Sequence, residues 1–304
     1  MYGNAIKNGK VNYAAFTNNG GTYSHDFVNG MGGVITGPTT STGSNTKIYP
    51  TGMNNHIVNS DCEDGVITDI NEIWEVGEDG LYYYEFTVNE VPATGGNIIF
   101  QAYGNVNDMC IWTWHIWLWP HDLSPVEITN KTGVKYNIMP VNLASKYDDD
   151  LVHIKNWFYQ GGRMTPLLCP SAYNSTSNNP SGSITIGNHV TDLASGISSP
   201  TTFYKSSDAP YNWFGDKNYY NLWDAACTTL GCSDNDVVKT VYDPCPVGFK
   251  MPNGNTFTGF STVNSIGSFT NGFKFKRNSS DTTGVFFPAS GVRYSNIGSL
   301  AYVG

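Results

Sequence analysis

Charged residues are scarce in this chain of 304 residues. Asp, Glu, Lys and Arg make up only 13% of it, about half the share found in an average soluble domain. The 16 basic residues form no cluster and the formal net charge is −9, so the chain lacks the positive surface that nucleic acids require. It also lacks a run of about 18 apolar residues, the length needed to span a bilayer. We therefore expect neither a nucleic-acid partner nor direct membrane insertion of this segment.

The short motifs of common catalytic and metal centres are also missing. The six cysteines form no C-x-x-C pair and no histidine stands at zinc-finger spacing, which disfavours a bound metal. H-E-x-x-H, G-x-S-x-G, G-x-G-x-x-G and the P-loop pattern do not occur. We expect no enzyme, no cofactor and no metal site. Cys227 and Cys232 could bridge each other, or either could bridge Cys245, in an oxidising compartment, and free buried thiols are an equal alternative.

What the chain has in abundance is Gly, Asn, Ser, Thr and Tyr, with 14% aromatic residues. This composition is typical of a folded, β-rich extracellular protein, because disordered chains are poor in aromatic residues. The length suits two ordinary domains. The polar start at residues 1–4 has neither the basic nor the apolar region of a signal peptide, so we expect a longer natural precursor.

The N-terminal part, residues 1–119, predicts an antiparallel β-sandwich. Residues 1 to about 55 carry mainly loop signals, and closely spaced strand patterns with hairpin connections follow. The last predicted strand places Trp112 and Trp114, and then His115, Trp117 and Trp119, on alternating faces, so we expect it to be buried on both sides between the sandwich and the rest of the chain. The five strands are expected at residues 65–68, 70–76, 81–88, 97–103 and 110–119.

The remainder, residues 120–304, predicts a second domain with a minor helical part. Acidic residues at the start of 146–160 favour a helix there. The Ser-, Asn- and Gly-rich segment 173–215 predicts a long insert with at most a short strand at 183–186, a length typical of a ligand-facing loop. Short strands are expected at 272–276 and 284–287. The fold class is therefore a β-dominated α+β protein.

Three groups of residues allow a functional and a structural interpretation. His115 could be a general base or a metal ligand, but a histidine among tryptophans favours a hydrogen-bonded core residue. Asp148–Asp150 could bind calcium, but calcium loops spread their oxygen ligands over alternating positions, which favours a helix N-terminus or a solvated charge run. The tryptophans of 110–119 could stack on sugar rings if exposed, whereas their alternation in an apolar strand favours the core.

Residues 243–252 read D-P-C-P-V-G-F-K-M-P. Three prolines and a glycine exclude a regular element, so this segment predicts a rigid, extended connector that fixes two parts of the fold. It resembles the D-P-C-P-x-G-[WF]-x-[VM]-P signature of the Fibrobacter succinogenes major paralogous (FISUMP) domain, which is common in secreted proteins of the Bacteroidetes. Three further segments are similar to that family in the same order: I-W-T-W-H-I-W at 111–117, W-F-Y-Q-G-G-R at 157–163 and F-F-P-A-S-G-V-R at 286–293.

The resemblance covers roughly residues 97–304, and N-T-F-T-G-F at 255–260 is similar to members fused behind a fimbrillin-like sandwich. It implies a fimbrillin-like region at 1–119, a C-type-lectin-like α+β domain at 120–304, and a lipoprotein precursor exported to the outer membrane. The framework residues that it implies are Trp112, Trp114, His115, Trp117, Asp243, Pro244, Cys245, Pro246, Gly248, Pro288, Gly291 and Arg293.

The chain departs from the family in two places. Family members continue beyond a glycine like Gly304 with two more strands, so we expect a C-terminally truncated domain whose missing edge is absent, disordered or supplied by another chain. Gly161 stands where the family often has tryptophan.

The leading hypothesis is a non-enzymatic, extracellular adhesin or pilus (fimbrial) tip subunit at the cell surface. Its expected partners are a glycan or a host or bacterial surface protein, together with other pilus subunits. The alternatives are a phage- or retroelement-diversified receptor-binding protein, variable near 290–304, and an oxidase similar to formylglycine-generating enzymes. Loops at 173–215 and after 288 are the expected ligand face, with aromatic anchors that offer contact area at low entropic cost: Tyr204, Tyr211, Trp213, Tyr219, Tyr220 and Tyr294.

Overall fold

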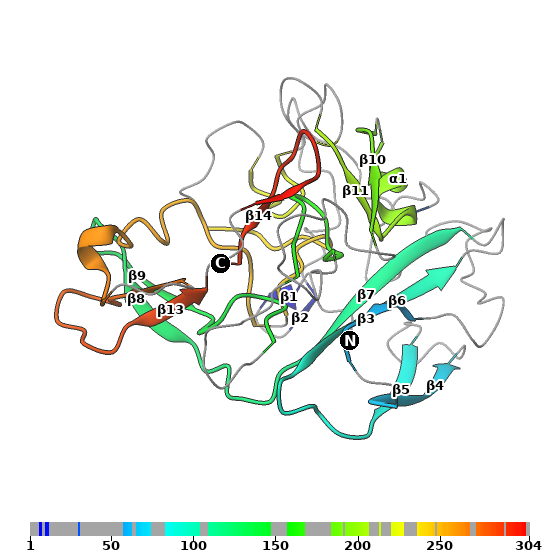
Figure 1. Ribbon diagram of the computed structural model, residues 1–304, viewed down its shortest axis with the longest axis horizontal. Coiled ribbons are helices and arrows are strands. Elements are labelled where there is room, and N and C mark those ends of the chain that lie inside the picture. The colour runs from blue at the N-terminus through cyan, green and yellow to red at the C-terminus, as the bar shows by residue number, and fades with distance from the viewer. Residues whose placement is uncertain are drawn as a thin grey trace.

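The computed structural model describes residues 57–62, 65–73, 83–103, 109–146, 157–167, 184–190, 192–206, 220–227, 236–246, 248–267, 272–288 and 290–301, with residues 6, 7, 10, 11, 30 and 213. Over these residues short strands dominate, in small and mostly antiparallel sheets, with one α-helix and one 3-10 helix (Figure 1). The β-dominated character is as predicted. No helix among these residues is long and apolar enough to cross a membrane.

Two small antiparallel sheets pack together within residues 57–118. A three-stranded sheet has the order β3 (Ile57–Ser60), β6 (Gly96–Tyr103), β7 (Cys110–Leu118), and β4 (Ile67–Ile73) pairs with β5 (Tyr83–Val88). Rings of Phe86 and Phe100 stack at 5.4 Å and join the hairpin to the sheet. The prediction of two separate strands at 65–68 and 70–76 is wrong in one respect, the break between them. They form the single strand β4, because an irregularity between Thr68 and Asn71 is accommodated within one ladder.

The turn before β6 depends on a glycine. Gly95 has a φ of +73°, and a Cβ atom there would lie 2.5 Å from the carbonyl oxygen of Leu118. Only glycine adopts this left-handed conformation without strain and leaves room for the neighbouring strand. The turn therefore fixes the register in which Gly96 pairs with Leu118 and Ile98 with Ile116.

Strand β7 lies between the two halves of the chain, as the sequence predicts. Trp114 and Ile116 pack with Phe100 toward the β4–β5 hairpin. On the other face, the hydroxyl of Thr113 bonds that of Thr165, and Trp117 donates its Nε1–H to the carbonyl of Ser145 at 2.8 Å. β7 ends one residue before the predicted domain boundary at residue 119, and that boundary stays a prediction.

Two further hairpins pack against each other and form a second hydrophobic core. β8 (Val126–Thr129) pairs with β9 (Lys135–Ile138), and β12 (Gly272–Phe275) pairs with β13 (Val285–Pro288). Ile128, Ile138 and Val285 are buried between them. The predicted strands at 272–276 and 284–287 are thus confirmed. The remaining short pairs are β1 (Ile6–Lys7) with β2 (Lys10–Val11) and β14 (Val292–Arg293) with β15 (Leu300–Ala301).

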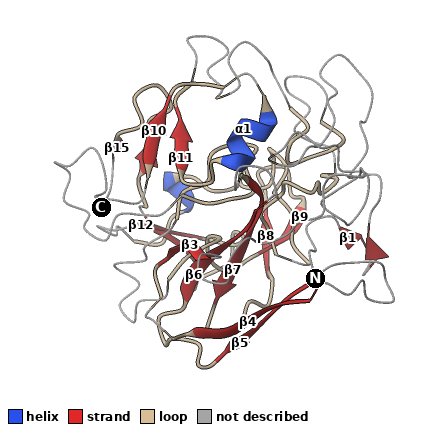
Figure 2. Cartoon of the chain, turned by 90° about the vertical axis from the view of Figure 1, so that its right-hand side faces the viewer, coloured by secondary structure: helices blue, strands red, loops and turns tan. Residues whose placement is uncertain are grey.

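The predicted insert at 173–215 contains more regular structure than the short strand expected at 183–186, which is found as β10 (Thr185–Gly187). β10 and β11 (Thr202–Tyr204) pair in parallel and are joined through α1 (Leu193–Ser198). Asp192 caps this helix by accepting a hydrogen bond from the Ser195 amide at 2.8 Å, the typical use of Asp at an N-cap. Figure 2 shows this unit on the opposite side of the β3–β6–β7 sheet from the β4–β5 hairpin.

The helix predicted at 146–160 is wrong at its C-terminal end. Phe158 forms an antiparallel bridge with Leu167, and each amide donates to the other's carbonyl, at 3.0 and 2.7 Å. The extended backbone sends Trp157 and Tyr159 to the same side, where both contact the sheet. Residues 147–156, including Asp148–Asp150, lie outside the described residues.

Candidate ligand-binding pocket

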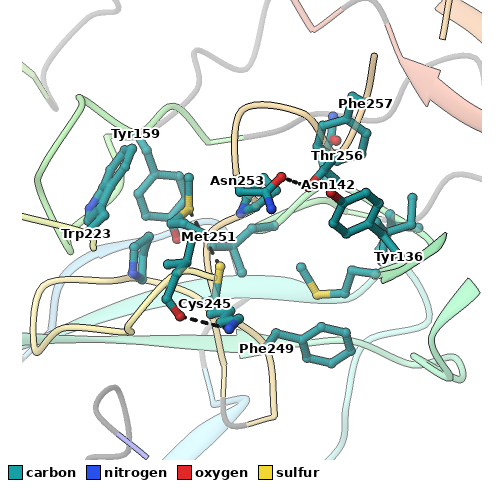
Figure 3. Close-up of a pocket in the computed structure, with 18 of the residues that line it drawn as sticks. Tyr136, Asn142, Tyr159, Trp223, Cys245, Phe249, Met251, Asn253, Thr256 and Phe257 are labelled. Carbon is teal, nitrogen blue, oxygen red and sulfur yellow. Dashed lines mark hydrogen bonds between the residues drawn. The ribbon is translucent and has the colours of Figure 1, made fainter. Parts of the chain in front are cut away.

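A cavity of about 550 Å³ is lined by residues from four stretches of the chain, 136–143, 157–159, 236–257 and 287–291, and by Trp223. We call it the pocket. Figure 3 shows Tyr159 and Trp223 on one side, Asn142 and Tyr136 on the other, and Met251 between them. Most lining side chains are aromatic, aliphatic or sulfur-containing, which is the usual composition of a ligand site.

The D-P-C-P connector forms the floor of the pocket and is held by Asp243. This carboxylate is fully buried, accepts the amide hydrogens of Cys245 at 2.8 Å and Met251 at 2.9 Å, and pairs with Lys239 at 3.0 Å. Lys239 also donates to the Cys245 carbonyl at 2.7 Å. A buried charge is tolerated only when it is paired and hydrogen-bonded. The connector is irregular and fixed, as predicted, and it presents Cys245 and Met251 to the pocket.

His115 supports the wall of the pocket from behind. Its Nε2 lies 2.9 Å from Asn97 Oδ1 and its Nδ1 lies 2.8 Å from the hydroxyl of Tyr159. The Asn97 amide nitrogen donates to Asp61 at 3.2 Å and to the Ala144 carbonyl at 3.1 Å, so Oδ1 must be an acceptor. His115 therefore donates from Nε2 and accepts from Tyr159 at Nδ1.

This arrangement requires a neutral imidazole. Burial lowers the pKa of His115 to about 3, because desolvation disfavours the charged ring. The indole of Trp157 also stacks against the ring, with centroids 6.1 Å apart. The core interpretation of His115 is thus supported by its contacts.

Asp61 joins the N-terminal sheet to the same wall. Its carboxylate accepts the amide hydrogen of Asn97 at 2.7 Å and the indole N–H of Trp157 at 2.6 Å, and Lys146 lies 3.7 Å away. Lys146 also donates to the Asp61 carbonyl at 2.8 Å. Trp157 and Tyr159, both lining residues, are therefore positioned by hydrogen bonds to residues of the N-terminal region.

The two deeply buried titratable groups of the pocket, Cys245 and Tyr159, are held in uncharged forms. Burial, with a smaller contribution from the negative charge of Asp243, raises the pKa of the Cys245 thiol far above its usual range. Burial also raises the pKa of the Tyr159 hydroxyl. A thiol in this state is a poor nucleophile, because the thiolate is the reactive form. Lys250 and Asp236, the charged lining residues, pair with each other at 2.5 Å.

Two of the predicted ligand anchors, Tyr204 and Trp213, lie in the interior instead of on a ligand face. Their rings stack at 6.0 Å and flank the guanidinium of Arg163, which lies 5.7 Å from each ring centroid. Trp213 donates to the Gly161 carbonyl at 2.8 Å, and Tyr204 to the Ser195 carbonyl at 3.0 Å. We attribute their burial to Arg163, whose desolvated charge needs aromatic faces and acceptors.

Arg163 itself ties the W-F-Y-Q-G-G-R segment to the β10–α1–β11 unit. It donates to the carbonyls of Thr202, Gly196, Ser199 and Pro200, and burial lowers its pKa to about 10. The close packing uses a glycine, because a Cβ atom at Gly196 would lie 2.4 Å from the Trp213 ring.

The two remaining predicted anchors that the structure describes, Tyr220 and Tyr294, do not line the pocket either. Tyr294 is 37% exposed and Tyr220 is partly buried, while Tyr211 and Tyr219 lie outside the described residues. In the F-F-P-A-S-G-V-R segment, Arg293 donates to the Gly298 carbonyl and its guanidinium lies 5.6 Å from the Phe203 ring. Among the described residues of the predicted ligand face, 290 and 291 are the ones that line the pocket.

Sequence reasoning missed most of the pocket. Asn142, Trp223, Phe249 and Met251 were not singled out as ligand-binding residues, although Phe249 and Met251 belong to the connector. The signal that could have found them is the connector itself, since a proline-rich loop held rigid by a buried acid is a natural wall for a site.

Cys227 is disulfide-bonded, whereas Cys62, Cys110 and Cys245 are free. The alternative of a bridge from Cys227 or Cys232 to Cys245 is therefore wrong, and the partner of Cys227 lies outside the described residues. Within those residues no three His, Cys, Asp or Glu side chains form a group that could hold a metal ion.

No protein-family model matches the chain, and no curated protein and no solved structure is significantly similar to it. The resemblance to FISUMP domains therefore rests on the sequence segments quoted above.

Proposed function

We propose that this chain is a non-enzymatic adhesin or pilus-tip subunit at the outer surface of a cell, and that it binds a glycan or protein ligand through the pocket. The observation that carries the proposal is the chemistry of the pocket: an aromatic and apolar cavity whose thiol, phenol and supporting imidazole are all held neutral. Such a site offers contact surface and shape, and its titratable groups are not tuned for proton or group transfer.

Two further observations support the proposal. The residues shared with the FISUMP signatures have structural tasks: Asp243 holds the connector, Arg163 and Arg293 bind backbone carbonyls, and His115 orients Tyr159. The disulfide at Cys227 suits an oxidising compartment outside the cytosol.

Glycan and host-matrix arrays probed with the full chain test the proposal. Deleting 173–215 would remove buried Phe203 and the β10–α1–β11 unit, so a point variant is the better comparison. Asn142→Trp fills the polar side of the pocket, and Thr87→Trp, at an exposed position of β5 outside every candidate ligand face, is the matched control. We expect the wild type and Thr87→Trp to bind the same ligands and Asn142→Trp to lose them, with unchanged melting temperatures. Equal binding by all three proteins would remove the pocket from the ligand face.

A second candidate is the diversified receptor-binding protein, which the β14–β15 loop favours. Hydrogen bonds between Tyr294 and Ser299 and between Gly298 and Tyr294, both 2.8 Å, hold the loop, while Ile297 is 58% exposed. A rigid loop with exposed side chains can display variable residues without loss of fold. In that case a Tyr294→Ser/Ile297→Ser variant loses array binding and Asn142→Trp keeps it.

A further inference from the structure

Building on the proposed function, we infer that the pocket takes an uncharged apolar or aromatic side chain from a protein partner. The first argument is the composition of the floor and walls. Four side chains of the floor and walls offer a ligand no free hydrogen-bonding group beyond two weakly bonding sulfur atoms. They are those of Cys245, Met251, Phe249 and Trp157. A ligand that fills this space gains by removing its own apolar surface from water.

The charges of the pocket point the same way. Of the described lining residues only Asp236 and Lys250 are charged. They neutralise each other at 2.5 Å, and their side chains are 91% and 42% exposed, so they belong to the rim. An ionic ligand group would lose its hydration in the pocket and find no partner, which excludes acidic and basic side chains.

The polar side of the pocket matches a peptide group. Asn253 accepts from the Asn255 amide at 3.2 Å and from the Thr256 hydroxyl at 2.9 Å through Oδ1, which leaves its amide nitrogen as the outward donor. Asn142 presents a second side-chain amide, whose donor and acceptor are not used by any described hydrogen bond. Side-chain amides can pair with the C=O and N–H of an extended peptide backbone.

An apolar surface continues from the pocket to the outside of the molecule. Phe257 and Phe287 line the pocket and meet edge to face at 5.9 Å. Phe273, the cross-strand partner of Phe287, is 46% exposed, and Phe257 is 37% exposed. A protein segment can cover this surface with residues that flank the inserted side chain.

A sugar ring fits these walls less well. Its hydroxyl groups project around the whole ring, and those that face Met251, Cys245 and Phe249 would be buried without a partner. Leaving a buried hydroxyl unsatisfied disfavours binding more than an aromatic contact favours it. The few amides on one side of the pocket cannot serve all of them.

The test uses the full chain labelled at its methionine methyl groups. The chain has seven methionines. Met139 and Met251 line the pocket, and Met164 lies elsewhere and serves as the internal reference. The probes are capped tripeptides Gly-X-Gly with X as Gly, Ala, Val, Leu, Phe, Asp or Lys, together with methyl glycosides of common hexoses. We expect Val, Leu and Phe peptides to shift Met139 and Met251, with affinity rising about fourfold per buried methylene (about 0.8 kcal/mol).

The controls separate this inference from the proposed function. Asn142→Trp should abolish the shifts and Thr87→Trp should preserve them. Shifts of Met251 by the glycosides and not by the peptides would overturn the inference and leave a glycan-binding adhesin. Shifts by the Asp or Lys peptides equal to those by Leu would overturn it as well. If neither class of probe shifts Met139 or Met251, the inference fails, and array binding that persists in Asn142→Trp would place the adhesin's ligand elsewhere.

Discussion

Two loops of this chain each contain an ion pair between a basic residue and an aspartate, in different surroundings. In the connector below the pocket, Lys239 pairs with Asp243 at 3.0 Å, and in the β12–β13 turn Arg277 pairs with Asp281 at 2.8 Å. Both pairs are four residues apart, and both carboxylates also accept backbone amide hydrogens. The Lys239 side chain is 6% exposed, whereas that of Arg277 is 38% exposed.

The difference in exposure indicates how much stability is lost when the acid of each pair is removed. Water can reach Arg277 and replace the hydrogen bonds that it makes. The ion pair in the turn therefore fixes the conformation of the turn and contributes little to the free energy of unfolding. Among the described residues, the Lys239 ammonium contacts the carboxylate of Asp243 and the carbonyls of Asp243 and Cys245 and no other polar group. Removing the acid there would leave an unpaired charge in the interior. The pocket floor therefore depends on Asp243 far more than the hairpin depends on Asp281.

Asp243→Ala should have the largest effect on stability. The variant loses the ion pair and both amide acceptors and leaves Lys239 buried without a counter-charge, which costs about 3–5 kcal/mol of unfolding free energy. Urea unfolding followed by tryptophan fluorescence measures it.

Asp243→Asn is the matched control. It keeps one acceptor oxygen for the Cys245 or Met251 amide and should lose less than Asp243→Ala. The double variant Lys239→Met/Asp243→Asn removes both charges and should recover part of the loss. An Asp243→Ala variant that is no less stable than Asp281→Ala would contradict the contrast between the two loops.

The sequence predicts the parts of the fold that local patterns determine. The alternating strand at 110–119, the β4–β5 hairpin, the strands near 272–287 and the irregular connector at 243–252 all carry their signal within short stretches of the chain, and all are found. The end of the predicted helix at 146–160 fails because the backbone of Phe158 is engaged by Leu167. Of the unit at 184–204, the sequence predicts the strand β10 but neither α1 nor β11, because these elements are only three to six residues long, too short for a periodic pattern.

The pocket is harder to foresee for a physical reason. Its walls come from stretches as far apart as 136–143 and 287–291, and no local pattern indicates that they meet. Burial of Tyr204 and Trp213 follows from Arg163, a cation some 40 residues away in the sequence. Aromatic residues in a polar, loop-like segment therefore gave a misleading indication of exposure.

The contrast between interior and surface also predicts different responses to acid. The folded-state pKa of His115 is about 3, below the ordinary value of about 6.5. Between these values the unfolded chain binds a proton that the folded chain does not, so stability falls as the pH falls below about 6.5. Between pH 7 and pH 5 the loss should be on the order of 2 kcal/mol.

His115→Gln tests this dependence. Glutamine can keep an N–H donor for Asn97 and does not titrate, so the variant should be less stable than the wild type at pH 7 but should lose less stability between pH 7 and pH 5. Urea unfolding at each pH measures both. Parallel pH profiles of the wild type and the variant would show that His115 protonates in the folded protein as readily as in the unfolded chain.

Asp281→Ala should have the smallest effect of the three. The variant removes a buried acceptor for the amides of Arg277, Thr283 and Gly284 but leaves a cation, Arg277, that water can reach, at a cost of about 1–2 kcal/mol at neutral pH. Hydrogen bonding to Arg277 holds the pKa of Asp281 well below its usual range. For a carboxyl group with a lowered folded-state pKa, the stabilisation is fully present above the ordinary value of about 4 and is lost as the pH falls below it. The difference between the wild type and Asp281→Ala in urea should therefore be constant from pH 7 to pH 5 and shrink below pH 4. A difference that already shrinks between pH 7 and pH 5, where His115 is expected to act, would show that the turn and the interior are coupled.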